Sequence, residues 1–578
     1  MCGKRIDHAE WRLTKSIVDI ERLRAVAAKH NVKIPDDEED YYRHLLNGLD
    51  ATAQQVADLP EYEDPRLQIE PETLPRQWFK QKPNPLNGWS HRAEIKLPSP
   101  KDKRLDNRTV AFKDNVSIGG VPLTGGTTPE ILTGKSEYPV PKIDAVVVKR
   151  VLEAAGTVSG SANCEHLSMS PLSFTSFTGP IHNPWARGYT TGGSSSGCAA
   201  LVGINQVKEW RKRHGLPPID EELGEGVDMA IGGDQGGSIR LPSAYAGIYG
   251  MKPTHGLVPY SGILSLFPMI DHTGPMTTNL EDLATLLGVV AGYDGIDPRC
   301  TPETPLREKV PDYSAQLASF KQTKQAAGEW TTSAAGKGLR IGVITESLAV
   351  PNLSPEIFKV IQEAISQFES IGASVSHISI PEHLLGPSIW TIATRAGIAS
   401  LGMRNMPPPL LCYPCPDITP PALSQSSFDI LDRHNPASAN MVFNATLLQE
   451  RPDGASLAAK AMMHVHELRA AYDRALTEVD VLITPVITRM HSQHPSLDAK
   501  VEDKMKPAIG STLNTCQFNV TGHPALSMPA GWGKAEDGDA KMPVAMQIIG
   551  KRFDEESVIK AAAAWEVGGL GLDKWDGR

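Results

Sequence analysis

Hydrophobic residues recur at helical spacing near the N-terminus. Between residues 8 and 27 they repeat every three or four positions, which predicts an amphipathic helix, and a second helix is expected over 39–56. Prolines and charged residues then dominate from 60 to 98, as in a tether. The pattern therefore predicts an N-terminal helical extension and linker over residues 1–85.

Short apolar runs alternate with helical patterns after this extension. Residues 109–112 read as a strand, and Asp144 is a suitable N-cap for a helix that ends at Gly156. Residues 157–160 look like the next strand. This strand–helix–strand order is typical of an α/β layer architecture.

A second unit of the same kind lies further along the chain. It begins with a strand over 339–344, continues through a helix that starts at Ser354 and Pro355, and closes with a strand over 375–380. Two more strands and a last helix are expected at 479–483, 545–549 and 555–565. We expect one main domain over 86–570.

Three segments of the main domain depart from this pattern. Residues 207–226 are charged and turn-rich and are expected to form a surface insertion. Residues 322–338 look like a polar linker, and the proline-rich stretch 404–440 is expected to be a surface excursion near a pocket mouth.

Composition and charge exclude several classes of function. Hydrophobic residues make up 40 % of the 578 residues, as in ordinary globular proteins. The net charge of −10 is spread along the chain, which argues against a nucleic-acid partner. No run of eighteen apolar residues and no apolar signal core are found, so no membrane association is expected.

Cysteine usage indicates a reducing compartment. The seven cysteines are odd in number and scattered, so a cytoplasmic location with free thiols is expected. Cys412 and Cys415 form one isolated C-x-x-C pair without a second pair or nearby histidines. We interpret this pair as a loop with two ordinary thiols and expect no metal site.

Two glycine–serine clusters, at residues 191–197 and 232–240, are candidates for chemistry. Runs of small residues let backbone N–H groups approach a ligand closely. An oxyanion hole is one use of such groups, and a flexible loop is the ordinary alternative. The first cluster also contains a literal G-x-S-x-G around Ser195, which would need partners such as Asp271 and His523 for a nucleophile elbow.

Three ordered motifs favour catalysis by their combination. Lys113 follows an apolar strand and precedes Asp-Asn, Ser194 is the first serine after paired glycines, and Ser238 lies in a G-G-S-I-R string. With their flanks, these motifs resemble the amidase-signature family over roughly residues 90–570. The resemblance implies an α/β/α sandwich around a mixed β-sheet.

The resemblance also implies a mechanism. Ser238 would attack an amide carbonyl, Ser194 would relay protons, and a neutral Lys113 would act as the final base. The backbone N–H groups of Gln235, Gly236, Gly237 and Ser238 would form the oxyanion hole. Ser195, Asp234 and Arg240 would support the site, the last two as a buried pair. No metal or cofactor is required, and Cys164 and Cys198 are interpreted as small buried residues.

The sequence departs from the family pattern at two points, and the second indicates a subgroup of the family. Ser194 and Ser238 lie 44 positions apart, further than in most relatives, and the excess falls in 207–226. Gln235 stands where many relatives have threonine. The Asp-Gln-Gly-Gly-Ser form resembles broad-range amidases, in which a helical N-terminal extension can help form a homodimer.

A small-molecule amide is the expected substrate, of aliphatic or aromatic type. Its acyl pocket would be built from residues 165–190, 385–445 and 511–525. Two alternatives stay open: a glutamine-dependent amidotransferase subunit that works in a complex, and a non-catalytic scaffold with the same fold.

Overall fold

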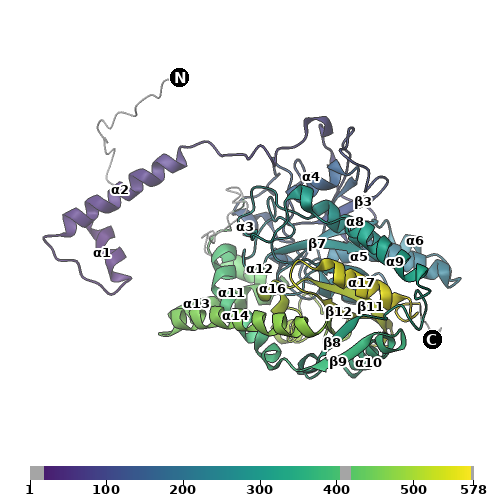
Figure 1. Ribbon diagram of the computed structural model, residues 1–578. Coiled ribbons are helices and arrows are strands. Elements are labelled where there is room, and N and C mark those ends of the chain that lie inside the picture. The colour runs from purple at the N-terminus through teal and green to yellow at the C-terminus, as the bar shows by residue number, and fades with distance from the viewer. Residues whose placement is uncertain (1–17, 404–417, 419, 574–578) are drawn as a thin grey trace, which may run out of the picture. The chain divides into compact units, whose positions relative to one another are not determined.

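The computed structural model describes residues 18–403, 418 and 420–573 (Figure 1). The chain divides into two compact units, one ending at Asp64 and the other beginning at Pro65. Cys412 and Cys415, and the first part of the helix expected over 8–27, lie outside the described residues.

The N-terminal unit is a helical hairpin of α1 (Ile20–Ala28) and α2 (Glu39–Ala57). The carboxylate of Asp19 caps α1 by accepting the N–H of Arg22 at 2.7 Å. Two hydrogen bonds of 2.6 Å join the Arg24 guanidinium to the carboxylate of Glu39, which lies on α2. Both expected helices are therefore present in the described part of this unit.

The second unit is organised around one twelve-stranded mixed sheet, which has the order β1-β2-β4-β3-β5-β7-β6-β11-β12-β10-β8-β9. Its strands are β1 (Trp78–Phe79), β2 (Trp89–Ile95), β3 (Thr109–Lys113), β4 (Thr157–Ala162), β5 (Met229–Asp234), β6 (Tyr249–Lys252), β7 (His272–Thr277), β8 (Arg340–Ile344), β9 (Ser374–Ile378), β10 (Val481–Pro485), β11 (Ala525–Lys534) and β12 (Lys541–Ile549). β3 pairs in parallel with β4 and β5, and β8 with β9 and β10, while the remaining pairs are antiparallel.

Helices connect and cover these strands. They are α3 (Pro129–Thr133), α4 (Val146–Glu153), α5 (Ser196–Arg213), α6 (Asp220–Leu223), α7 (Arg240–Ala246), α8 (Leu280–Val290), α9 (Tyr313–Ala326), α10 (Pro355–Ser370), α11 (Gly386–Met403), α12 (Gln425–His434), α13 (Pro436–Glu450), α14 (Gly454–Glu478), α15 (Val501–Met505), α16 (Gln517–Thr521) and α17 (Glu555–Glu566). Short 3₁₀ turns are η1 (Pro71–Thr73), η2 (His166–Ser168), η3 (Arg307–Lys309), η4 (Thr345–Leu348) and η5 (Pro381–Leu385).

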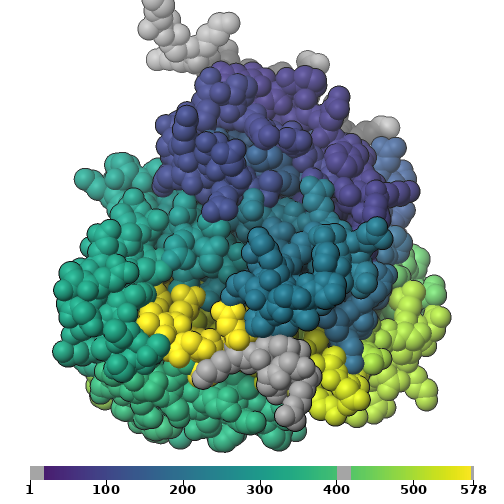
Figure 2. All heavy atoms as spheres, turned by 90° about the vertical axis from the view of Figure 1, so that its right-hand side faces the viewer, coloured from purple at the N-terminus to yellow at the C-terminus, as the bar shows by residue number. Residues whose placement is uncertain are grey.

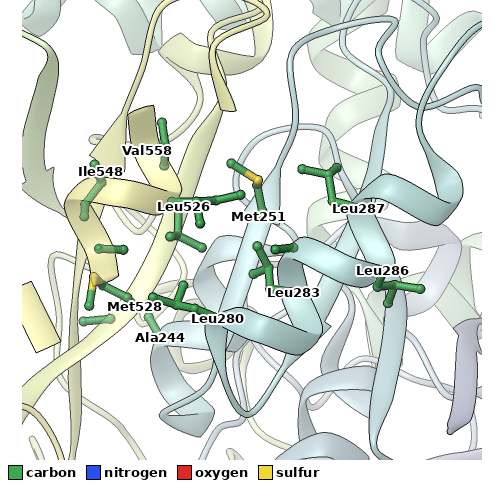
Figure 3. Packing of buried hydrophobic residues seen from close by; sticks show 14 of the residues in the cluster. Ala244, Met251, Leu280, Leu283, Leu286, Leu287, Leu526, Met528, Ile548 and Val558 are labelled. Atoms are coloured by element: carbon green, nitrogen blue, oxygen red, sulfur yellow. The ribbon is translucent and has the colours of Figure 1, made fainter. Parts of the chain in front are cut away.

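Both faces of the central strands of the sheet are buried, whereas the edge strands β1 and β9 are largely exposed. Side chains alternate between the two faces of a strand, and on β3 Val110 and Phe112 join one apolar cluster while Ala111 joins another. Figure 3 shows the first cluster, where Leu283 of α8 lies close to Met251 of β6. The structure therefore confirms the α/β class, with helices on both sides of a mixed sheet.

Segments far apart in the sequence meet in this unit. β11 and β12 lie in the middle of the sheet, between β6 and β10. Figure 2 shows C-terminal residues, in yellow, at the surface between a teal segment from the middle of the chain and a blue segment from nearer the N-terminus.

Most strand and helix positions agree with the apolar pattern, but Asp144 is not an N-cap. α4 is preceded by Ala145, and no side chain caps it. The Asp144 carboxylate instead accepts two hydrogen bonds from Arg76, at 2.6 and 2.7 Å, and one from the N–H of Gly119. An ion pair with a distant arginine has replaced the local cap.

Parts of the three unusual segments are helical. Residues 207–213 continue α5 rather than forming a loop, because Trp210 is buried against Trp185 and Trp532. α9 extends through Ala326, and the described part of 404–440 contains α12 and the start of α13. Among the helices of the described residues, none combines the length and hydropathy that a bilayer crossing requires.

Candidate active site

Lys113 and the two glycine–serine loops meet at the carboxyl ends of β3 and β5. β3 and β5 are parallel neighbours, so Lys113 at the end of β3 lies beside the loop that follows Asp234 at the end of β5. The second loop precedes α5, which packs on both strands and begins directly after Ser195. The two glycine–serine clusters and the lysine are therefore brought together by the fold.

Lys113 is completely buried and contacts Ser194. Its Nζ donates a hydrogen bond to the Ser194 Oγ at 2.7 Å. Burial lowers the pKa of Lys113 below its ordinary value, and the neighbouring Cys164 and Cys198 oppose this shift only in part. Both cysteines are free and fully buried, as expected.

Ser195 joins the two glycine–serine loops. Its hydroxyl donates to the carbonyl of Gly233 at 3.0 Å and accepts the N–H of the same residue at 3.1 Å. Its backbone N–H donates to the carbonyl of Ser238 at 3.2 Å. The Ser195 hydroxyl is therefore fully engaged with the backbone.

The nucleophile-elbow alternative around Ser195 is contradicted by the structure. His523 hydrogen-bonds to Thr521 and Asp473, whereas the Asp271 carboxylate accepts from Gln235 and from backbone N–H groups. An Asp271–His523–Ser195 relay is consequently absent from the described residues.

Asp234 and Arg240 form a completely buried ion pair under the Ser238 loop. Arg240 donates from Nε and Nη2 to the Asp234 carboxylate, at 3.0 and 2.9 Å. Asn519 also donates to this carboxylate at 2.8 Å. Burial alone would raise the pKa of Asp234, but the charge of Arg240 and these hydrogen bonds hold it well below its usual range.

The Asp234 carboxylate also fixes the loop backbone. It accepts the N–H of Gly237 at 2.8 Å and that of Ile239 at 3.0 Å. The prediction that Gly237 contributes a free oxyanion donor is therefore wrong, because its N–H already has an acceptor. The N–H groups of Gln235, Gly236 and Ser238 have no acceptor among the described residues.

Ser238 lies where this loop borders a pocket. It is half-buried, and no described residue accepts or donates a hydrogen bond at its Oγ. The structure thus joins Lys113 to Ser194 directly and leaves the Ser238 hydroxyl facing open space.

The pocket beside Ser238 has a volume of about 250 Å³ and an apolar wall. The residues that line it are Ser168, Met169, Ser170, Pro171, Gln235, Gly236, Ser238, Leu241, Leu266, Trp390, Ile398, Ala437, Met441, Met505, Ala508, Ile509 and Thr512. All three segments expected to build the acyl pocket contribute to it. The sequence analysis missed Leu241, Leu266 and the stretch 505–509. These residues are apolar, and their sequence pattern does not distinguish a pocket wall from a hydrophobic core.

Glu165 is a further buried group near the lysine, and the sequence analysis gave it no individual role. Its carboxylate accepts from the hydroxyls of Ser196 and Thr175, both at 2.6 Å. Its backbone N–H donates to the carbonyl of Ser194 at 3.2 Å. Burial raises the pKa of Glu165 to about 7, although these hydrogen bonds oppose the shift.

Comparisons with known proteins show the family of the chain. The Amidase family model matches residues 91–208 and 224–559. An enantioselective amidase of Rhodococcus rhodochrous is 35 % identical over 528 residues, covering 90 % of each chain. One subunit of the glutamyl-tRNA(Gln) amidotransferase of Methanosarcina mazei is 28 % identical over 478 residues, covering 79 % of this chain and 83 % of that protein.

A solved structure shares the fold. The 6-aminohexanoate cyclic dimer hydrolase superimposes with a TM-score of 0.60 at 22 % identity, covering 82 % of this chain and 86 % of that one. With the family match over most of the chain, the fold, the motifs and the sequence relatives agree: the chain belongs to the Amidase family and is an enzyme of the amidase class.

Proposed function

We propose that the protein hydrolyses the C–N bond of carboxamides through an acyl-enzyme on Ser238. The observation that carries this proposal is the 2.7 Å hydrogen bond between the buried Lys113 Nζ and the Ser194 Oγ, beside a loop whose Ser238 is open to a pocket. The hydrogen-bond partner of Lys113 is a hydroxyl and not a carboxylate, so burial can lower its pKa. A general base must be free of its proton, and a lowered pKa favours this neutral form.

In the first half-reaction, Ser238 Oγ forms a bond to the amide carbon. Its proton passes to Ser194, while the Ser194 proton passes to Lys113. The N–H groups of Gln235, Gly236 and Ser238 supply hydrogen bonds to the developing oxyanion. The intermediate then collapses with cleavage of the C–N bond. Ser194 gives a proton to the leaving nitrogen, and Lys113 returns its proton to Ser194.

In the second half-reaction, water attacks the ester carbon of the acyl-enzyme. The same relay removes the proton of this water and returns it to Ser238 as the C–O bond to the serine breaks. A carboxylate leaves, and the resting protonation state is restored. The reaction consumes one water and requires no metal or cofactor.

The pocket supports a substrate with a hydrophobic acyl group. No charged side chain is found among the described residues that line it, and an engineered apolar cavity of about 150 Å³ is large enough to hold benzene. A volume of about 250 Å³ therefore accommodates an aromatic ring with a short aliphatic connection. We propose primary amides of aryl-substituted or medium-sized aliphatic acids as substrates.

The same pocket argues against a glutamine-dependent amidotransferase. The ammonium and carboxylate of glutamine require charged or strongly polar partners, and the described wall beside Ser238 offers none that is charged. The homodimer and the cytoplasmic location that the sequence indicates remain predictions.

The test is ammonia release by the purified protein from a panel of aliphatic and aromatic primary amides. Ser238→Ala should abolish release, while Ser370→Ala, a change at the exposed end of α10, should keep it. Retention of activity in Ser238→Ala would refute the assignment of the nucleophile. If the parent neither releases ammonia nor reacts with a serine-directed probe, the non-catalytic scaffold becomes the better interpretation.

A further inference from the structure

Trp390 links the wall of the pocket to the loop that carries Ser238. It lies on α11, and its indole N–H donates to the carbonyl of Gln235 at 3.0 Å. Its ring also lines the pocket and lies 3.3 Å from the position that a Cβ atom on Gly236 would occupy. This tryptophan therefore contacts both the loop backbone and the space for the acyl group.

The hydrogen bond from Trp390 fixes the direction of one N–H group. The carbonyl of Gln235 and the N–H of Gly236 belong to the same peptide plane and point in opposite directions. Holding the carbonyl toward α11 therefore holds the N–H on the other side. No other described residue donates to this carbonyl, so the orientation depends on the indole.

The next peptide group is fixed independently. The Thr515 hydroxyl donates to the carbonyl of Gly236 at 2.6 Å, and the N–H of Gly237 in the same plane is bound by Asp234. The Gly236 N–H, by contrast, has no acceptor among the described residues. It is therefore a donor available to a ligand, and its direction is set through Trp390.

We propose that Trp390 is a positioning residue, whose indole N–H aims the Gly236 N–H at the oxyanion that forms during amide cleavage. This inference rests on the proposed hydrolase function. Because a donor stabilises the transition state only when it is already aimed, loss of the indole hydrogen bond lowers kcat for every amide, whatever its acyl group.

The expected size follows from the effect of a missing donor. Removing one oxyanion donor costs about 10²–10³ in kcat. Trp390→Phe leaves the Gly236 N–H in place but no longer anchored, so we expect a loss in kcat of about 10- to 100-fold. A residue that served only as pocket wall would instead affect KM, and only for acyl groups large enough to touch the ring.

The experiment compares acetamide with an aryl amide that the parent enzyme hydrolyses. For Trp390→Phe, we expect similar fold losses in kcat on both substrates. Met441→Ala removes wall without touching the loop, and its effect should be concentrated in KM for the aryl amide. Trp330→Phe, a tryptophan change away from the pocket, serves as the control for activity and urea midpoint.

Trp390→His keeps a ring N–H and should recover part of the kcat lost in Trp390→Phe. The proposal is overturned if Trp390→Phe, folded by its urea midpoint, keeps kcat on acetamide within twofold of the parent. It is also overturned if Trp390→His has the larger loss. Absence of activity in the parent enzyme, or activity in Ser238→Ala, would instead overturn the proposed function itself.

Discussion

The buried pair of Asp234 and Arg240 should be the point where the stability of the Ser238 loop is most sensitive to a single change. Asp234→Asn keeps the size of the side chain but removes its charge and one of its two acceptor oxygens. One carboxylate oxygen accepts from Gly237, Arg240 and Asn519, and the other accepts from Ile239 and Arg240. In Asp234→Asn, an NH₂ group would replace one of these two oxygens, and its N–H bonds would point at N–H donors that then have no acceptor there.

The magnitude follows from the burial of the pair. Both side chains have no exposed surface, so Arg240 would keep its charge without a counter-ion. Removing one partner of a buried ion pair costs about 3–5 kcal/mol of unfolding free energy. Either the Gly237 N–H or the Ile239 N–H would also lose its acceptor, so the loop should relax and kcat should fall together with stability.

Urea denaturation followed by tryptophan fluorescence measures this effect. The matched control is Asp498→Asn, which breaks an exposed ion pair with Arg433 and should cost less than about 1 kcal/mol. Equal urea midpoints for Asp234→Asn and Asp498→Asn would refute the reasoning. Loss of stability with full kcat would show that the pair supports the fold but not the geometry of the loop.

Three further predictions concern the base, a buried acid and the pocket. Burial lowers the pKa of Lys113, so kcat/KM should rise with pH as the lysine becomes neutral and level off below pH ~10.4, and Lys113→Met should lower kcat/KM about 10⁴-fold or more. Burial raises the pKa of Glu165 from 4.5 to about 7, so its stabilising contribution is full below pH 4.5 and is lost as pH rises through 7. The parent should therefore lose about 2.5 kcal/mol between pH 5 and 8 relative to Glu165→Gln, and equal pH profiles of their urea midpoints would exclude this. Ile398→Trp should fill the pocket and raise KM for aryl amides about tenfold or more while acetamide is little affected; a uniform change would place the acyl group elsewhere.

The sequence determined the parts of this protein that are encoded locally or by motif. The alternation of apolar runs predicted β3, β4, α10 and their order, because strand and helix periods are properties of neighbouring residues. The Asp234–Arg240 pair was also accessible, since only six positions separate the two residues. The contact between Lys113 and Ser194 spans 81 positions and was expected only through the resemblance to a family.

Tertiary structure alone decided the surroundings of these residues. Asp144 is a sound N-cap by local rules, but Arg76, 68 positions away, binds its carboxylate more strongly than a helix N-terminus can. Gly237 lost its expected role because the Asp234 carboxylate lies within reach of its N–H. The contact between Trp390 and Gln235 spans 155 positions, so no local pattern predicts it. The pocket wall was also unpredictable, because its residues have the same apolar pattern as a core. Periodicity records which residues avoid water, whereas the site depends on which distant residues the fold brings within hydrogen-bond distance of one another.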